Sequence, residues 1–104
     1  MKSEKRAKHE PSDIGKRLKR IRRRAGIDPE VLSAVCGLSR THVHCIEVGW
    51  IVSPRQETLL ALSRVLGVSL DHLLAGRGGA PSAEEVKAAF GRAQAAFSRA
   101  QAAQ

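Results

Sequence analysis

Apolar residues recur at every third or fourth position through most of this chain, and no segment alternates apolar and polar residues as a strand does. The spacing therefore predicts an all-α fold. We expect five helices in the first three quarters of the sequence, at about 13–25, 29–36, 39–48, 54–66 and 70–75. An additional C-terminal helix is expected from residue 82 onward.

Residues that typically start and stop helices set these bounds. Asp28 is a suitable cap for a helix with Pro29 at its first position, and Gly37 has the backbone freedom to leave that helix. Ser39 is a suitable cap for the next helix, which ends at Gly49. The other expected caps are Ser12 or Asp13, Ser53, Ser69 and Ser82. The segment 28–49 is thus predicted to form two short helices joined by a tight turn.

The second helix of this pair is expected to turn an unusually polar face outward. Val43 and Ile46 are its inward residues, and the helix is about ten residues long. A short helix that is braced by another and rich in hydrogen-bonding groups suits the major groove of DNA. Its outward residues are Arg40, Thr41, His42, His44 and Cys45.

The charge of the chain is concentrated at one end. The formal net charge is +8, and residues 1–25 contain eleven Lys/Arg against three acidic residues, whereas the remainder is balanced. Such a concentrated basic region indicates a polyanionic partner. A merely solvated surface and an anionic membrane surface are the alternatives. The residues expected to contact DNA phosphates are Lys16, Arg17, Lys19, Arg20, Arg23 and Arg24.

The C-terminal helix has its own apolar seam. Two glycines and a proline in residues 77–81 indicate a hinge before it. The seam repeats at intervals of four and three residues, as in a short coiled coil, and consists of Val86, Phe90, Ala93, Phe97 and Ala100. We expect this seam to pack against a second subunit; folding back onto its own domain is the alternative.

Residues 14–74 resemble the lambda-repressor-like, Cro-type helix-turn-helix family, whose fold is a five-helix DNA-binding domain. The resemblance is carried by the segments IGKRLKRIRRRAGI, LSAVCGLSRTHVHCIEVG and ETLLALSRVLGVSLDHLL. Apolar positions, the turn glycine and the caps agree across all five helices. The sequence departs from the family at Pro29, where the family usually has a glutamine that clamps a phosphate.

The resemblance implies roles for individual residues. Arg40, Thr41 and Cys45 match positions that contact bases, and a guanidinium suits guanine O6 and N7; a phosphate contact is the alternative for Arg40. Arg22 matches an arginine that pairs with the glutamate at the end of the recognition helix, here Glu47. Positions that contact either bases or phosphates are Ser39, His42 and His44.

These observations predict a domain order and a function. Residues 1–11 are expected to be a disordered basic arm, 12–76 the helix-turn-helix DNA-binding domain, 77–81 a hinge and 82–104 the dimerisation helix. We expect a transcriptional regulator that binds double-stranded DNA, and the preferred interpretation is a homodimeric repressor that binds a palindromic operator. One alternative is an antitoxin that binds its own promoter and a toxin. Another is a helical protein-interaction adaptor that does not bind DNA.

Other classes of protein find little support. The sequence has no glycine-rich phosphate loop, no nucleophile–base pair and no clustered carboxylates, so no enzymatic activity and no cofactor are expected. Cys36, Cys45 and the histidines lack the spacing of a metal site, and His72 is expected at the surface. No apolar run approaches a membrane span. We therefore expect a cytoplasmic, nucleoid-associated protein with reduced thiols.

Overall fold

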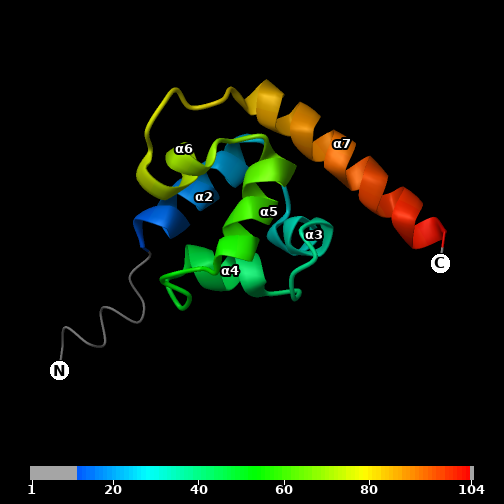
Figure 1. Cartoon of the computed structure of the whole chain (residues 1–104), viewed down its shortest axis with the longest axis horizontal. Coiled ribbons are helices and arrows are strands. Elements are labelled where there is room, and N and C mark those ends of the chain that lie inside the picture. Colours follow the sequence, from blue (N-terminus) through cyan, green and yellow to red (C-terminus); the bar gives the residue numbers. More distant parts are fainter. Residues whose placement is uncertain (1–11, 104) are drawn as a thin grey trace.

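The computed structural model describes residues 12–103, and every regular element within them is a helix (Figure 1). In chain order these are α2 (Asp13–Arg24), α3 (Pro29–Val35), α4 (His42–Glu47), α5 (Gln56–Leu66), α6 (Leu70–Ala75) and α7 (Ala83–Ala102). The predicted all-α fold, with a helix-turn-helix arrangement and an additional C-terminal helix, is confirmed. The expected arm 1–11 lies outside the described residues.

Helices α2 to α6 share one apolar core. Each of them contributes at least one side chain with no exposed surface, and these side chains are Leu18, Leu32, Val43, Ile46, Leu62, Leu66 and Leu73. Burying such a side chain contributes about 1.5–3 kcal/mol. Because α4 and α6 have only six residues each, they are too short to be stable alone and depend on this packing.

Several helices begin where the sequence predicts. The Ser12 hydroxyl accepts a hydrogen bond from the Gly15 N–H at 3.0 Å, and the Asp28 carboxylate accepts one from the Glu30 N–H at 2.8 Å. These bonds satisfy N–H groups that have no partner inside the helix. The same arrangement is present at Ser69 in α6 and in the reciprocal pair of Ser82 and Glu85 in α7.

Two helix starts differ from the prediction. Helix α4 begins at His42, and the Ser39 side chain does not cap it; instead the Ser39 carbonyl accepts from the His42 N–H at 3.0 Å within a turn. Helix α5 begins at Gln56 because Arg55 still has an extended backbone, with φ −66° and ψ 156°. Helix α4 has six residues and is shorter than the ten residues expected.

Helix α2 crosses α4 at Gly15, which is buried. A Cβ atom at this position would collide with the carbonyl oxygen of Ile46. The absence of a side chain therefore allows the two backbones to approach closely. This contact sets the position of α4 relative to α2.

Helix α7 packs on its own domain, mainly against α5 (Figure 1). Val86 and Phe90 are only 2% and 9% exposed and belong to the main core. These two residues, expected at a subunit interface, are thus buried within one chain. Farther along the helix, Ala93 and Phe97 are half-buried and Ala100 is exposed. The seam therefore divides into a buried first half and a more open second half.

Candidate nucleic-acid interface

An ion pair joins the end of α4 to α2. Arg22 Nε lies 2.6 Å from Glu47 Oε2, and Arg22 Nη2 donates to Glu47 Oε1 at 2.8 Å. Nη1 of the same arginine donates to the Ile27 carbonyl at 2.8 Å. Glu47 is 5% exposed, so the bidentate pair is sheltered from water. The structure thus brings together the two residues that the family resemblance paired, and their contact holds α4 in a defined orientation.

Ser33 provides a second brace, which the sequence did not reveal. Its buried hydroxyl donates to the Pro29 carbonyl at 3.0 Å and accepts from the Val43 N–H at 3.1 Å. The second bond satisfies a free N–H in the first turn of α4, in place of an N-terminal cap. The only available signal was a small polar residue at an inward position next to Leu32.

The outward side of α4 forms a narrow strip. Successive helical residues are turned by about 100°, so Thr41 and Cys45 share the centre of this side while His42 and His44 flank it. Thr41 and His44 are exposed, and His42 and Cys45 are half-buried. The inward side is occupied by Val43, Ile46 and Glu47, all buried.

Ser39 and Arg40 lie in the turn before α4, and Thr41 is the N-cap residue, whose carbonyl accepts from the Cys45 N–H at 2.9 Å. All three are exposed. The Arg40 Nε lies 3.2 Å from Glu30 Oε1, and the two side chains are 79% and 55% exposed. Such an exposed pair contributes about 0–1 kcal/mol, so Arg40 can exchange this carboxylate for another partner at little cost.

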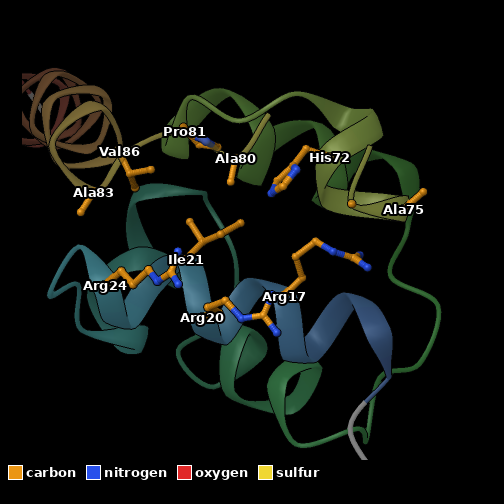
Figure 2. A pocket seen from close by; sticks show the side chains of 11 residues that line it. Arg17, Arg20, Ile21, Arg24, His72, Ala75, Ala80, Pro81, Ala83 and Val86 are labelled. Carbon is orange, nitrogen blue, oxygen red and sulfur yellow. The ribbon is translucent and has the colours of Figure 1, made fainter. Parts of the chain in front are cut away.

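The basic residues of α2 spread over a broad arc of the helix, from the side near α4 to the side near α6. By helical geometry, Lys19 and Arg23 lie within about 100° of Arg22, on the flank of α2 that faces α4. Lys16 lies between the flanks. The others lie about 140–160° from Arg22 and line a cavity with α6 (Figure 2): these are Arg17, Arg20 and Arg24.

Arg17 also has a partner inside the fold. Its Nη1 donates to the Leu73 carbonyl at 2.8 Å, near the end of α6. This bond satisfies a carbonyl in the last turn of a helix, where a positive charge is favoured. The structure therefore assigns Arg17 a role in packing α6, which the count of basic residues could not show.

Two further residues are shielded from solvent, since Cys36 is half-buried and His72 is buried. Burial raises the pKa of the Cys36 thiol to about 12, partly offset by the positive charge of Arg64. Cys36 therefore stays protonated near neutral pH and is a poor nucleophile. His72 is 9% exposed, so the expectation of a surface histidine is wrong. It faces inward from α6, next to the fully buried Leu73.

The described part of the chain holds no group of three or more His, Cys, Asp or Glu side chains that could bind a metal ion. Residues 12–103 also include no helix long and apolar enough to cross a membrane.

Comparison with known proteins gives one match. A family model described as helix-turn-helix matches residues 18–73, which run from α2 through α6 and make up just over half of the chain. No curated protein and no solved structure matches this chain. The matched segment contains both braces of α4 and the exposed turn before it.

Proposed function

This chain belongs to the lambda repressor/Cro-like helix-turn-helix family, a family of DNA-binding transcription regulators, and on that premise we propose that it is a homodimeric repressor of a palindromic operator. The observation that carries the proposal is the bracing of α4 by Arg22–Glu47 and by Ser33, behind an exposed polar strip. A rigidly held helix can present side chains to base edges at reproducible positions. Such a repressor acts in the cytoplasm, at the nucleoid.

Base reading is assigned to Arg40, Thr41 and Cys45. Arg40 precedes α4 in an exposed turn and has only a weak internal partner. Its guanidinium can donate two hydrogen bonds to guanine O6 and N7 in the major groove. Thr41 and Cys45 lie one helical turn apart and face the same way. The margin of this strip, which contacts bases or phosphates, is formed by Ser39, His42 and His44.

Phosphate attraction is assigned first to Lys19 and Arg23, which lie on the α4 side of α2. Lys16 is exposed beside them. Arginine and lysine side chains that neutralise phosphates release counterions, so binding should weaken steeply with salt. The arginines on the other flank are turned away from α4.

The contact with a second copy of this chain is assigned to the second half of the α7 seam. An open groove of about 610 Å³ lies between α3 and the second half of α7, and its apolar residues include Val31, Val35, Leu38 and Phe97. The second half of α7 extends beyond the helical domain (Figure 1). A matching helix of a second copy would cover Phe97, with Ala93 and Ala100 allowing close approach.

The proposal is tested by measuring DNA binding directly. The operator is identified by selection from a random duplex pool and by a footprint on the DNA beside the coding region of the protein. Replacing Arg40 with Ala should weaken operator binding about 5- to 150-fold, the equivalent of about 1–3 kcal/mol, and relax preference at one base pair per half-site. The matched variant Arg99→Ala, at an exposed position of α7, should change binding less than twofold.

Two results would overturn parts of this assignment. Equal weakening on all sequences would make Arg40 a phosphate contact. Binding that shows no dependence on sequence or salt would refute operator recognition and favour the adaptor alternative.

The dimer is tested by sedimentation of the full chain. Phe97→Ser should convert dimer to monomer while α-helical circular dichroism is retained, because Phe97 is half-exposed in one chain. Phe90→Ser is the comparison variant and should lower the melting temperature, because Phe90 is in the core. A wild-type chain that sediments as a monomer, or a Phe97→Ser variant that stays dimeric, contradicts this interface. Recovery of the chain in a stoichiometric complex with a second small protein would favour the antitoxin alternative.

A further inference from the structure

A second basic feature lies away from α4. A partly open cavity of about 500 Å³ lies between α2, α6, the hinge 77–81 and the start of α7 (Figure 2). Three arginines on one flank of α2 line it, namely Arg17, Arg20 and Arg24. No acidic residue is among the described residues that line the cavity. The positive charge of this cavity is therefore not neutralised by its own walls.

His72 reaches the same cavity from α6. Its side chain is directed into the space between α2 and the hinge (Figure 2). The residue is 9% exposed, and its Nδ1 atom has no hydrogen-bond partner. A buried polar atom without a partner is uncommon and disfavours the folded state. The His72 ring lines the cavity, so an anion bound there would lie beside an imidazole that can donate from a ring N–H.

We propose that this cavity binds a small, multiply charged phosphate compound. Guanidinium groups match the spacing of phosphate oxygens and can donate two parallel hydrogen bonds to them. Three arginines and a histidine suit a ligand of high charge density, and about 500 Å³ lies within the size range of small-molecule sites. Nη1 of Arg17 is used by the Leu73 carbonyl, which leaves its other N–H groups for the ligand.

The cavity lies on the side of α2 opposite its contact with α4. Gly15 and Arg22 mark the side of α2 that contacts α4. The cavity arginines lie about 140–160° around the helix from Arg22. The ligand would also touch the hinge and Val86 at the start of α7. Its binding would therefore connect α2 and α6 to the position of α7.

Pyrophosphate is the probe for this site. Titration calorimetry on the full chain, at constant ionic strength, should give saturable binding with one site per chain. In histidine ring NMR spectra, the His72 resonances should shift along the same saturation curve, while those of His42 and His44 stay in place. Absence of saturable binding, or equal shifts of all three histidines, would overturn the proposal. This measurement uses the unmodified protein, so it does not depend on any variant folding.

Variants with matched charge locate the site. Arg20→Gln combined with Arg24→Gln should weaken pyrophosphate binding at least tenfold. Arg92→Gln combined with Arg99→Gln removes the same charge from exposed positions of α7 and should change it less than twofold. Equal weakening in both double variants would show general charge attraction and refute a built site.

Two competitors define the ligand class. Citrate should bind at least tenfold more weakly than pyrophosphate; equal binding would refute the assignment to phosphate compounds. Duplex DNA of random sequence should leave pyrophosphate affinity within twofold. Displacement of pyrophosphate by this duplex would assign the arginines to the DNA surface and overturn a separate site. This last result leaves operator recognition through α4 unaffected, so the two proposals fail separately.

Discussion

The two flanks of α2 carry similar basic residues in very different surroundings. On the flank that faces α4, every guanidinium nitrogen of Arg22 donates to an acceptor, and Gly15 allows the backbones to touch. On the flank that faces α6, Arg17, Arg20 and Arg24 surround a cavity without a carboxylate among its described lining residues. One flank is a closed structural joint, and the other keeps unused hydrogen-bonding capacity. Charge alone therefore does not assign a role to an arginine; its acceptors do.

The largest expected effect comes from breaking the closed joint. Arg22→Ala and Glu47→Ala should each lower the free energy of unfolding by about 3–5 kcal/mol, because each leaves an uncompensated buried charge. The double variant should recover part of this stability, measured by urea denaturation. The exposed pair Arg40–Glu30 is the control, and its removal should cost about 0–1 kcal/mol. Strictly additive effects of the single variants would show that Arg22 and Glu47 are not coupled.

The close approach at Gly15 gives the next effect. Gly15→Ala should lower the free energy of unfolding by about 1–3 kcal/mol, because the new Cβ forces α4 away from α2. Gly91→Ala is a matched control inside α7, where nothing lies within 4 Å of an added Cβ. That variant should stabilise the protein by about 0.5–1 kcal/mol. Thermal and urea denaturation measure both, and stabilisation by Gly15→Ala would contradict the tight crossing.

On the α6 flank of α2, the hydrogen bond from Arg17 to the Leu73 carbonyl can be tested in the same way. Arg17→Met keeps most of the apolar length of the side chain but removes the bond to the Leu73 carbonyl. We expect the free energy of unfolding to fall by about 1 kcal/mol. Hydrogen exchange should show this change as faster opening of α6 than of α4. Unchanged exchange in α6 would mean that the bond contributes nothing to its stability.

The last pair of variants should not change stability. It tests which flank of α2 contacts DNA. Lys19→Gln combined with Arg23→Gln should leave the melting temperature unchanged, because both side chains are exposed. The log–log salt slope of DNA binding should decrease by about 0.9 for each phosphate that is no longer neutralised, or about 1.8 in total. The Arg20→Gln and Arg24→Gln pair should leave this slope unchanged. The opposite result would place DNA on the α6 flank of α2.

Periodicity and capping residues predicted the helices well because these signals are local. Asp28, Ser69 and Ser82 accept hydrogen bonds from N–H groups two or three residues away, so the sequence alone locates them. The start of α4 could not be predicted in this way. The Val43 N–H in its first turn donates to the hydroxyl of Ser33, ten residues earlier. This contact exists only after α3 and α4 have packed.

Candidate site residues were harder to divide into roles. The six basic positions of α2 were predicted as one phosphate-binding group, yet Arg17 donates to α6 and three of them line a cavity. The stripe of α7 was equally ambiguous, since an apolar seam looks the same whether its partner is the same chain or another. Val86 and Phe90 are buried by contacts far away in the sequence, which no pattern within α7 specifies.

The burial of the first half of α7 determines where the chain can be truncated without loss of the fold. The family match ends at residue 73, which invites a minimal fragment that stops near the hinge. Such a fragment would lack Val86 and Phe90, whose burial contributes about 1.5–3 kcal/mol each. It would also lose the close contact of α7 with Gly67, where an added Cβ would lie 2.7 Å from the Ala89 Cβ. The cooperative folding unit therefore includes the first half of α7, and an expression fragment or a fusion junction belongs after Ala93, beyond the last residue that packs on the core.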